Sequence, residues 1–305
     1  MSWSSALLSA TEQAWAANDK PMISSNSLKR TEGLDIRWAV GTTSGTTGST
    51  NNEDTTYISE NIMDGFPGIV SKPNASDGFF TIVIDASASP LTFDWFGILN
   101  HNLKTLACTS MRLEIADYGT FTGASLLSTT NINSIMSSDD RFSDLTLFHT
   151  GTVARRYSAV QFVRIRITIA SGVPQIGQVI LGRRRQQQFH PSLPWDSTGE
   201  RSRSDDFTAP SGMLSRQMRY KARREIDASF RHSTPTEQSD LLSWWDQIDE
   251  GGLPFYYHDA PATYPSDFNM MMMGRPSLRY PWTTSTTRDF SLRAVEQGPS
   301  FFSQE

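Results

Sequence analysis

Histidine and cysteine are the residue types that most often bind metal ions, and their spacing in this chain predicts no metal site. None of the five histidines lies two, three or four residues from another, which is the spacing that places two ligands on one side of a strand or helix. Cys108 is the single cysteine, so the chain has neither an intrachain disulfide nor a cysteine-based zinc site. We expect Cys108 to be a buried, inert thiol, and we expect no metal or other cofactor.

Signatures of catalysis are also absent from the sequence. The chain contains no G-x-S-x-G elbow, no phosphate-binding loop with G-K-S/T, and no G-x-G-x-x-G after a strand. Carboxylates such as Asp85, Asp94 and Glu114 are scattered, and sequence alone does not pair them for glycoside hydrolysis. We therefore expect a protein that is not an enzyme, and a hydrolase of cell-surface glycans stays open as an alternative.

Arginine is clustered in a way that points to binding rather than catalysis. One block directly follows a predicted strand, and a second group lies shortly after it; together they are Arg183, Arg184, Arg185, Arg216, Arg219, Arg223 and Arg224. Three successive arginines at a strand end place side chains on both faces, so at least one is free for a partner. These residues are either salt-bridge donors to a neighbouring subunit or solvated strand ends, and we favour a subunit interface.

Composition and charge also indicate which classes of partner and location to expect. The formal net charge is −5, which argues against a general nucleic-acid binder because such proteins present a basic face. No apolar run approaches the length of about 18 residues that a membrane span needs. The first residues lack the basic flank and apolar core of a signal peptide, so we expect synthesis in the cytoplasm.

The elements before residue 185 are predicted to be strands. Residues 34–40 alternate in polarity as a first strand, and further strand-sized apolar runs bounded by turn residues follow. Residues 159–185 predict two more strands, joined at Ser171-Gly172-Val173-Pro174 as a β-hairpin that completes a sandwich. Helix-period stretches are nearly absent in this part of the chain. The expected fold is mainly β, with an antiparallel β-sandwich over residues 1–185 that includes an irregular lead-in.

The chain changes character after residue 185. Residues 186–209 are polar and contain proline, and predict a linker. Residues 210–305 predict a smaller α+β domain with one main helix. Thr234, Pro235 and Glu237 form a capping box with proline at the first helical position. The helix is expected to carry a wide apolar face, made by Leu241, Leu242, Trp244, Trp245 and Ile248.

The order of motifs over about residues 34–182 resembles the discoidin or galactose-binding-like jelly roll. The motifs that carry this resemblance are the N-x-x-D-G turn near Asp64, the segment FGILNHNL, the strand LEIAD and the stretch VRIRITIASG followed by PQIGQVILG. The resemblance implies that loops at one end of the sandwich bind a glycan or calcium, through residues such as Asp64, Asn100, His101 and Asn102. No acidic cluster has calcium-loop spacing, and Asn-His-Asn after a strand also satisfies backbone groups at a turn.

Residues 210–298 resemble small α+β domains of tail-tip and baseplate proteins of tailed bacteriophages. The resemblance rests on the strand EIDASFR, the capped helix, the segment GGLPFYY and the strand DFSLRAVE. It implies a structural component of a phage tail, located in the virion, that forms a homo-oligomeric ring with other tail proteins and contacts a host-surface glycan. The sandwich comes first here, whereas many distal tail proteins place the assembly domain first. The alternative function is a soluble, lectin-like carbohydrate-binding protein.

Overall fold

The computed structural model describes most of the chain. The described residues are 4–7, 21–28, 33–40, 52–63, 69–74, 79–103, 105–119, 121, 125–130, 137–139, 142–149, 155–186, 196–208, 214–248, 252–258, 268–273 and 288–296. Strands dominate them, and the helices among them are the 3-10 helix η2 (Ser59–Met63) and the α-helix α2 (Pro235–Gln247). The expected mainly β fold is confirmed.

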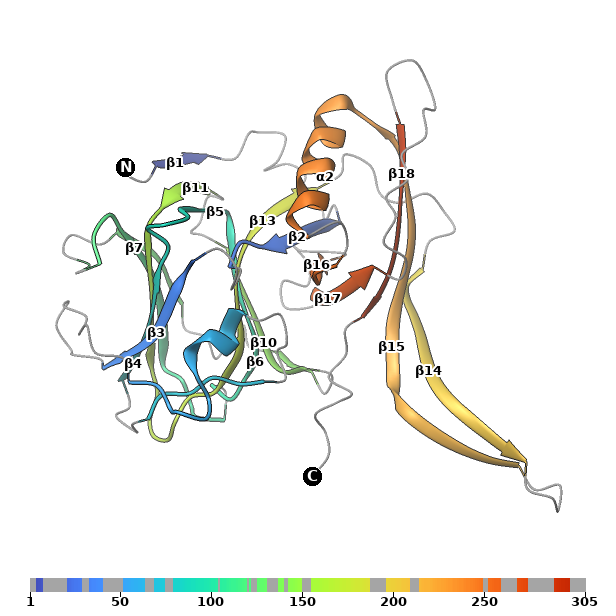
Figure 1. Ribbon diagram of the computed structural model, residues 1–305, viewed down its shortest axis with the longest axis horizontal. Coiled ribbons are helices and arrows are strands. Elements are labelled where there is room, and N and C mark those ends of the chain that lie inside the picture. The colour runs from blue at the N-terminus through green and yellow to red at the C-terminus, as the bar shows by residue number, and fades with distance from the viewer. Residues whose placement is uncertain are drawn as a thin grey trace.

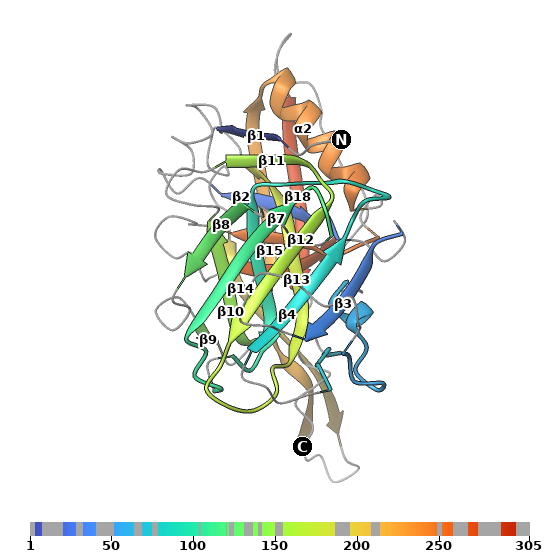
Figure 2. The ribbon, with the colours of Figure 1, turned by 90° about the vertical axis from the view of Figure 1, so that its left-hand side faces the viewer.

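Two antiparallel sheets form the sandwich (Figures 1 and 2). The first has five strands, in the order β3 (Asp35–Val40), β4 (Phe79–Asp85), β12 (Phe162–Thr168), β7 (Ser110–Ala116) and β8 (Ser125–Thr130). The facing strands belong to a ten-stranded sheet, and are β2 (Met22–Asn26), β13 (Ile176–Gln186), β6 (Trp95–His101), β10 (Phe142–His149) and β9 (Ser137–Asp139). A three-stranded sheet of β1 (Ser4–Leu7), β11 (Arg155–Val160) and β5 (Leu91–Phe93) lies at one end.

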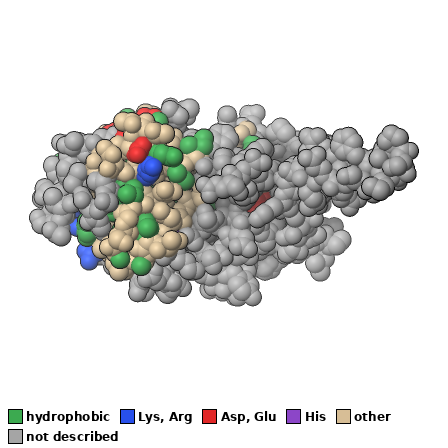
Figure 3. Space-filling view, turned by 90° about the horizontal axis from the view of Figure 1, so that it is seen from below, with side chains coloured by type: hydrophobic (Ala, Val, Ile, Leu, Met, Phe, Trp, Pro, Cys, Tyr) green, Lys and Arg blue, Asp and Glu red, His purple; other side chains and the backbone are tan. Residues whose placement is uncertain are grey.

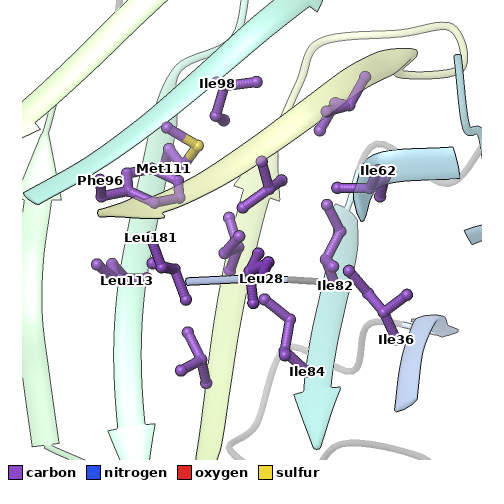
Figure 4. Close-up of a cluster of buried hydrophobic side chains, with 14 of the residues drawn as sticks. Leu28, Ile36, Ile62, Ile82, Ile84, Phe96, Ile98, Met111, Leu113 and Leu181 are labelled. Atoms are coloured by element: carbon purple, nitrogen blue, oxygen red, sulfur yellow. The ribbon is translucent and has the colours of Figure 1, made fainter. Parts of the chain in front are cut away.

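The sandwich core lies between these sheets. Figure 4 shows side chains of β3, β4 and β7 facing those of β6 and β13, with Ile82, Leu113, Phe96 and Leu181 among them. Their alternation along each strand directs every second side chain inward. Each fully buried Ile, Leu, Val or Phe contributes about 1.5–3 kcal/mol relative to an exposed one, so this cluster is the main source of stability for the sandwich.

The expected hairpin over residues 159–185 is wrong, although both of its strands exist. β12 pairs with β4 and β7 in the five-stranded sheet, whereas β13 pairs with β2 and β6 in the other sheet. The connection, residues 169–175, therefore crosses from one sheet to the other. Each strand already has a neighbour on both edges, so no edge is left on which the two strands could pair with each other.

The ten-stranded sheet continues past the sandwich into the C-terminal part of the chain. Beyond β2 it adds β16 (Phe255–His258), β17 (Phe268–Met273), β18 (Arg288–Glu296), β15 (Leu214–Ser233) and β14 (Asp196–Thr208). The irregular lead-in that the sequence predicts before residue 34 therefore contains a strand, β2, which pairs with β13 on one side and β16 on the other. The expected linker 186–209 is corrected as well, because thirteen of its residues form β14.

Helix α2 confirms the local prediction at its start. The Thr234 hydroxyl oxygen accepts a hydrogen bond from the Glu237 amide at 3.4 Å, and the Glu237 carboxylate accepts one from the Thr234 amide at 2.7 Å. Leu241, Trp244 and Ile248 are buried against β16 and β18. The predicted apolar face was too wide, because Leu242 is 40% exposed and Trp245 is only partly buried. Both residues follow the buried ones by one position, about 100° around the helix.

Candidate functional site

The predicted glycan-binding residues lie where β6 ends, at one end of the sandwich. Asn100 has a left-handed backbone, with φ of 50°, a conformation that asparagine tolerates better than most residues. His101 is 2% exposed, and its Nδ1 accepts a hydrogen bond from the Leu103 amide at 3.3 Å. Burial lowers the pKa of His101 to about 3, so the imidazole is neutral at physiological pH. Asp64 lies outside the described residues.

The Asn102 side chain forms hydrogen bonds with residues 169–175, the connection that crosses between the two sheets. Its side-chain amide donates to the Val173 carbonyl at 3.1 Å and accepts from the Gln175 amide at 2.8 Å. The structure thus brings Asn100, His101 and Asn102 next to this connection and gives His101 and Asn102 contacts with backbone groups. A glycan-binding function for these residues stays a prediction.

Other segments at the same end place polar and aromatic groups near one another. The Lys72 Nζ lies 3.8 Å from the centre of the Tyr57 ring and 3.8 Å from the Asp54 carboxylate. Ser71 pairs with Ile176 of β13, which ties this segment to the connection that Asn102 holds. Figure 3 looks at the molecule from below the view of Figure 1, and its described surface over the sandwich is mostly uncharged with scattered hydrophobic side chains.

The arginine block 183–185 lies near the other end of β13, seven to nine residues or roughly 23–30 Å along the strand from Ile176, the pairing partner of His101. Arg184 faces Asp94, whose carboxylate is fully buried. The Arg184 amide donates to Asp94 Oδ1 at 2.8 Å, and Arg156 Nη2 lies 3.1 Å from Asp94 Oδ2. Burial raises the pKa of Asp94, while the positive charges of Arg184 and Arg156 act in the opposite direction. The cluster is a buried, charge-paired junction between β5, β6, β11 and β13.

Arg185 points to the other face of the same strand and binds α2. Its Nε donates to the Asp240 carbonyl at 2.7 Å, and its Nη2 lies 3.4 Å from the Ser243 hydroxyl and 3.3 Å from the Gln247 amide oxygen. Burial lowers the pKa of Arg185 to about 10. Arg183 makes a longer, more exposed ion pair with Asp240, at 3.4 Å. Because Leu181, Arg183 and Arg185 share one face of β13, α2 and the five-stranded sheet lie on the same side of the ten-stranded sheet.

These contacts change the expectation for the arginine block. Arg184 and Arg185 are 5% and 4% exposed, so they are neither solvated strand ends nor surface donors to a neighbouring subunit. Arg185 joins β13 to helix α2 of the C-terminal part, whereas Arg184 joins β13 to Asp94 within the sandwich. Arg216, Arg219, Arg223 and Arg224 belong to β15, and their side chains lie outside what the structure describes. A subunit interface at those four residues remains a prediction.

The structure also assembles a charged group that the sequence did not reveal, on the outer face of the five-stranded sheet. Glu114 of β7 contacts Arg164 of β12 at 2.5 Å and Arg166 of the same strand at 3.7 Å. The Arg164 guanidinium stacks 4.5 Å above the Phe121 ring, and the Arg166 guanidinium lies 5.2 Å from the Phe79 ring. The alternation of arginine with isoleucine along β12 is visible in the sequence, but Glu114 becomes their partner only through the pairing register of β7 and β12.

Three further observations concern metal ligands, membrane-spanning helices and one of the scattered carboxylates. Within the described residues, no three His, Cys, Asp or Glu side chains are placed so that they could hold a metal ion. In the same part of the chain, no helix has the length and apolar character that crossing a membrane requires. Asp85, one of the scattered carboxylates, accepts hydrogen bonds from the Ser87 amide at 2.9 Å and the Ser87 hydroxyl at 2.6 Å.

Comparisons with known proteins give weak similarities. No family model and no curated protein matches the chain. Among solved structures, a chitosan-binding module from a Paenibacillus chitosanase/glucanase is 14% identical and covers 52% of this chain and 98% of its own, with a TM-score of 0.33. A carbohydrate-binding module of Clostridium perfringens has the same identity and coverage, with a TM-score of 0.34.

A Ruminococcus gnavus fucosidase, solved with fucose, is 16% identical over 56% of this chain, with a TM-score of 0.33. The match spans only 28% of the fucosidase. At this level of similarity, the matches define neither a family nor a ligand.

Proposed function

We propose that this chain is a non-catalytic, carbohydrate-binding subunit of a larger assembly. In this proposal the sandwich binds a glycan, and the C-terminal part joins the sandwich to copies of the chain and to other subunits. The observation that carries the assembly function is the ribbon formed by β14 and β15, which leaves the body of the molecule in Figure 1.

The ribbon is long, and over most of its length no third strand from the described residues pairs with it. β15 has 20 residues, but β18 pairs only with residues 225–233 of it. Among the strands that the structure describes, only β14 pairs with residues 214–224, and at about 3.3 Å per residue they extend roughly 35 Å. A two-stranded ribbon is marginally stable in water by itself, and its free edges are templates for pairing with another chain. A neighbouring subunit that packs on this ribbon would supply the missing contacts.

The ribbon is joined to the sandwich through continuous secondary structure. β13 contributes to the sandwich core through Val179 and Leu181 and binds α2 through Arg185. β2 then links β13 to β16 by backbone pairing. A subunit held by its ribbon would therefore hold its sandwich in a fixed orientation, as a display of binding modules requires.

The carbohydrate part of the proposal rests on the sequence resemblance to galactose-binding-like jelly rolls and on the confirmed β-sandwich. A tailed-phage virion is the setting we propose for the assembly, on the resemblance of residues 210–298 to tail-tip and baseplate domains. A soluble lectin-like protein that binds glycans as a monomer is the competing proposal. The ribbon favours the assembling form, because a monomeric lectin does not need a two-stranded extension whose outer edges are left without a neighbour.

Assembly is tested by shortening the ribbon in the full chain. Replacing residues 201–222 with a short Gly-Ser turn should leave a folded monomer and abolish oligomers detected by light scattering after size exclusion. A matched control replaces a stretch of the polar segment 42–50 with Gly and Ser, and should assemble like the parent. Unchanged assembly of the shortened chain would overturn the assembly function of the ribbon.

Carbohydrate binding is tested separately, on a glycan array with the intact protein. Binding at micromolar affinity supports the proposal, and absence of binding to any glycan would remove the carbohydrate part while leaving the assembly part. Turnover of a bound glycan would contradict the proposed lack of catalysis.

A further inference from the structure

The outer face of strands β7 and β12 carries more positive than negative charge. Residues that point away from the sandwich core on β12 and β7 include Arg164, Arg166, Arg112 and Glu114, as their alternation with the buried Ile165, Ile167, Leu113 and Ile115 shows. Figure 2 shows these strands side by side, with β4 next to β12. The whole chain has a net charge of −5, so the outer surface of these two strands differs in sign from the molecule as a whole.

The guanidinium groups on this face are held in place by their neighbours. The Glu114 carboxylate forms ion pairs with both Arg164, at 2.5 Å, and Arg166, at 3.7 Å. Aromatic rings of Phe121 and Phe79 lie under the two guanidinium groups, at 4.5 and 5.2 Å, and cation–π contact restrains their orientation further. One carboxylate is therefore shared between two ordered positive charges.

Arg112 adds a third charge directly beside them. It is the cross-strand partner of Arg166, so their Cα atoms are about 4.5–5.5 Å apart. Like charges opposite each other on a sheet are destabilising. Arg112 is exposed and makes no ion pair with a carboxylate in the part of the chain that the structure describes. An anion placed between Arg112 and Arg166 would relieve this repulsion.

We propose that Arg112 and Arg166 bind the acidic groups of an anionic polysaccharide. This inference rests on the proposed carbohydrate-binding function and names the substrate class. A guanidinium matches a carboxylate or sulfate with two parallel hydrogen bonds. The half-buried Phe79 ring, beside Arg166, offers an apolar surface on which the face of a sugar ring packs. A sheet surface with this combination favours an extended sugar chain over an acidic peptide, which has no such apolar ring face.

The inference is tested by measuring binding of the intact protein to heparin, to polygalacturonate, to neutral dextran and to poly-glutamate at low and physiological salt. We expect binding to one or both acidic polysaccharides, and a weakening of about ten- to hundredfold in Arg112→Gln because charge-assisted hydrogen bonds are lost. Arg37→Gln is the matched control, since Arg37 lies on the same face but pairs with Asp35 at 3.1 Å. It should change affinity by less than about threefold, as expected of an exposed pair.

The outcomes distinguish sulfate from carboxylate as the acidic group. They also distinguish failure of this inference from failure of the proposed function. Preference for heparin identifies sulfate, and preference for polygalacturonate identifies carboxylate; both support the inference. Equal losses in Arg112→Gln and Arg37→Gln, no loss in Arg112→Gln, or binding to poly-glutamate alone would overturn it. Binding to neutral glycans only would overturn this inference but not the proposed function, whereas no carbohydrate binding of any kind would overturn this inference and the carbohydrate part of the proposed function. Melting curves of both variants confirm that they are folded.

Discussion

The Arg184 amide donates a 2.8 Å hydrogen bond to the carboxylate of Asp94, a side chain with no exposed surface. The Arg184 guanidinium is itself almost fully buried and also binds the Asp94 carbonyl at 3.1 Å. A charge pair of this kind forms where β5, β6 and β13 meet. Its removal should therefore affect folding of the sandwich as a whole.

Replacing Asp94 by Asn should destabilise the protein by about 3–5 kcal/mol, because the buried Arg184 loses its counter-charge. Chemical denaturation followed by circular dichroism measures this change. Asp35→Asn is the control, because the Asp35 side chain is 63% exposed and pairs with Arg37 at the surface; it should cost about 0–1 kcal/mol. Equal effects of the two substitutions would show that Asp94 is not buried as the structure places it.

His101 should make stability fall as the solution becomes acidic. Its pKa is lowered by burial to about 3 in the folded state, against about 6.5 when unfolded. The unfolded chain binds the proton first, so the stability contributed by neutral His101 is fully present above pH 6.5 and is lost progressively as the pH falls toward 3. Between pH 7 and pH 5 the loss is about 2 kcal/mol.

The measurement is the free energy of unfolding across that pH range for the parent and for His101→Gln. The variant retains an oxygen acceptor for the Leu103 amide but does not titrate, so its profile should be flatter by about 2 kcal/mol. Parallel profiles would contradict a buried, neutral His101.

Trp244 should matter far more than Leu242 for the C-terminal part. Trp244 is fully buried and packs edge-on against Phe255, with ring centres 5.1 Å apart. Trp244→Ala should cost about 3–5 kcal/mol, whereas Leu242→Ala, at a site that is 40% exposed, should change stability by less than about 0.5 kcal/mol. Thermal unfolding of both variants tests the assignment of the buried helix face.

Within the arginine block, Arg185 should stabilise the fold and Arg183 should not. Arg185→Ser removes hydrogen bonds to the Asp240 carbonyl, Ser243 and Gln247, at a cost of about 2–3 kcal/mol. Arg183→Ser removes only a half-exposed pair with Asp240, worth about 0–1 kcal/mol. Hydrogen exchange of the α2 amides should rise in the first variant and stay unchanged in the second. Faster exchange in both would show that the block acts as one unit.

Short-range interactions explain which features the sequence determined. The start of α2 followed from Thr234, Pro235 and Glu237, since a capping box involves residues only three apart. The inward row of β12, with Ile165 and Ile167, followed from alternation, since the side-chain period of a strand is fixed by backbone geometry. Both features are set within a few residues.

Tertiary structure decided everything that depends on which strands become neighbours. β12 and β13 were recognisable as strands, but whether they pair with each other depends on β2, β4, β6 and β7, which are distant in sequence. The segment 196–208 is too polar to predict a strand, and it becomes one because β15 offers an edge with which its backbone can pair. The sequence predicts Arg184 and Arg185 at the surface, whereas the fold buries them against Asp94 and α2. A charged side chain is buried only where the folded chain supplies its partner, and no local pattern encodes that partner.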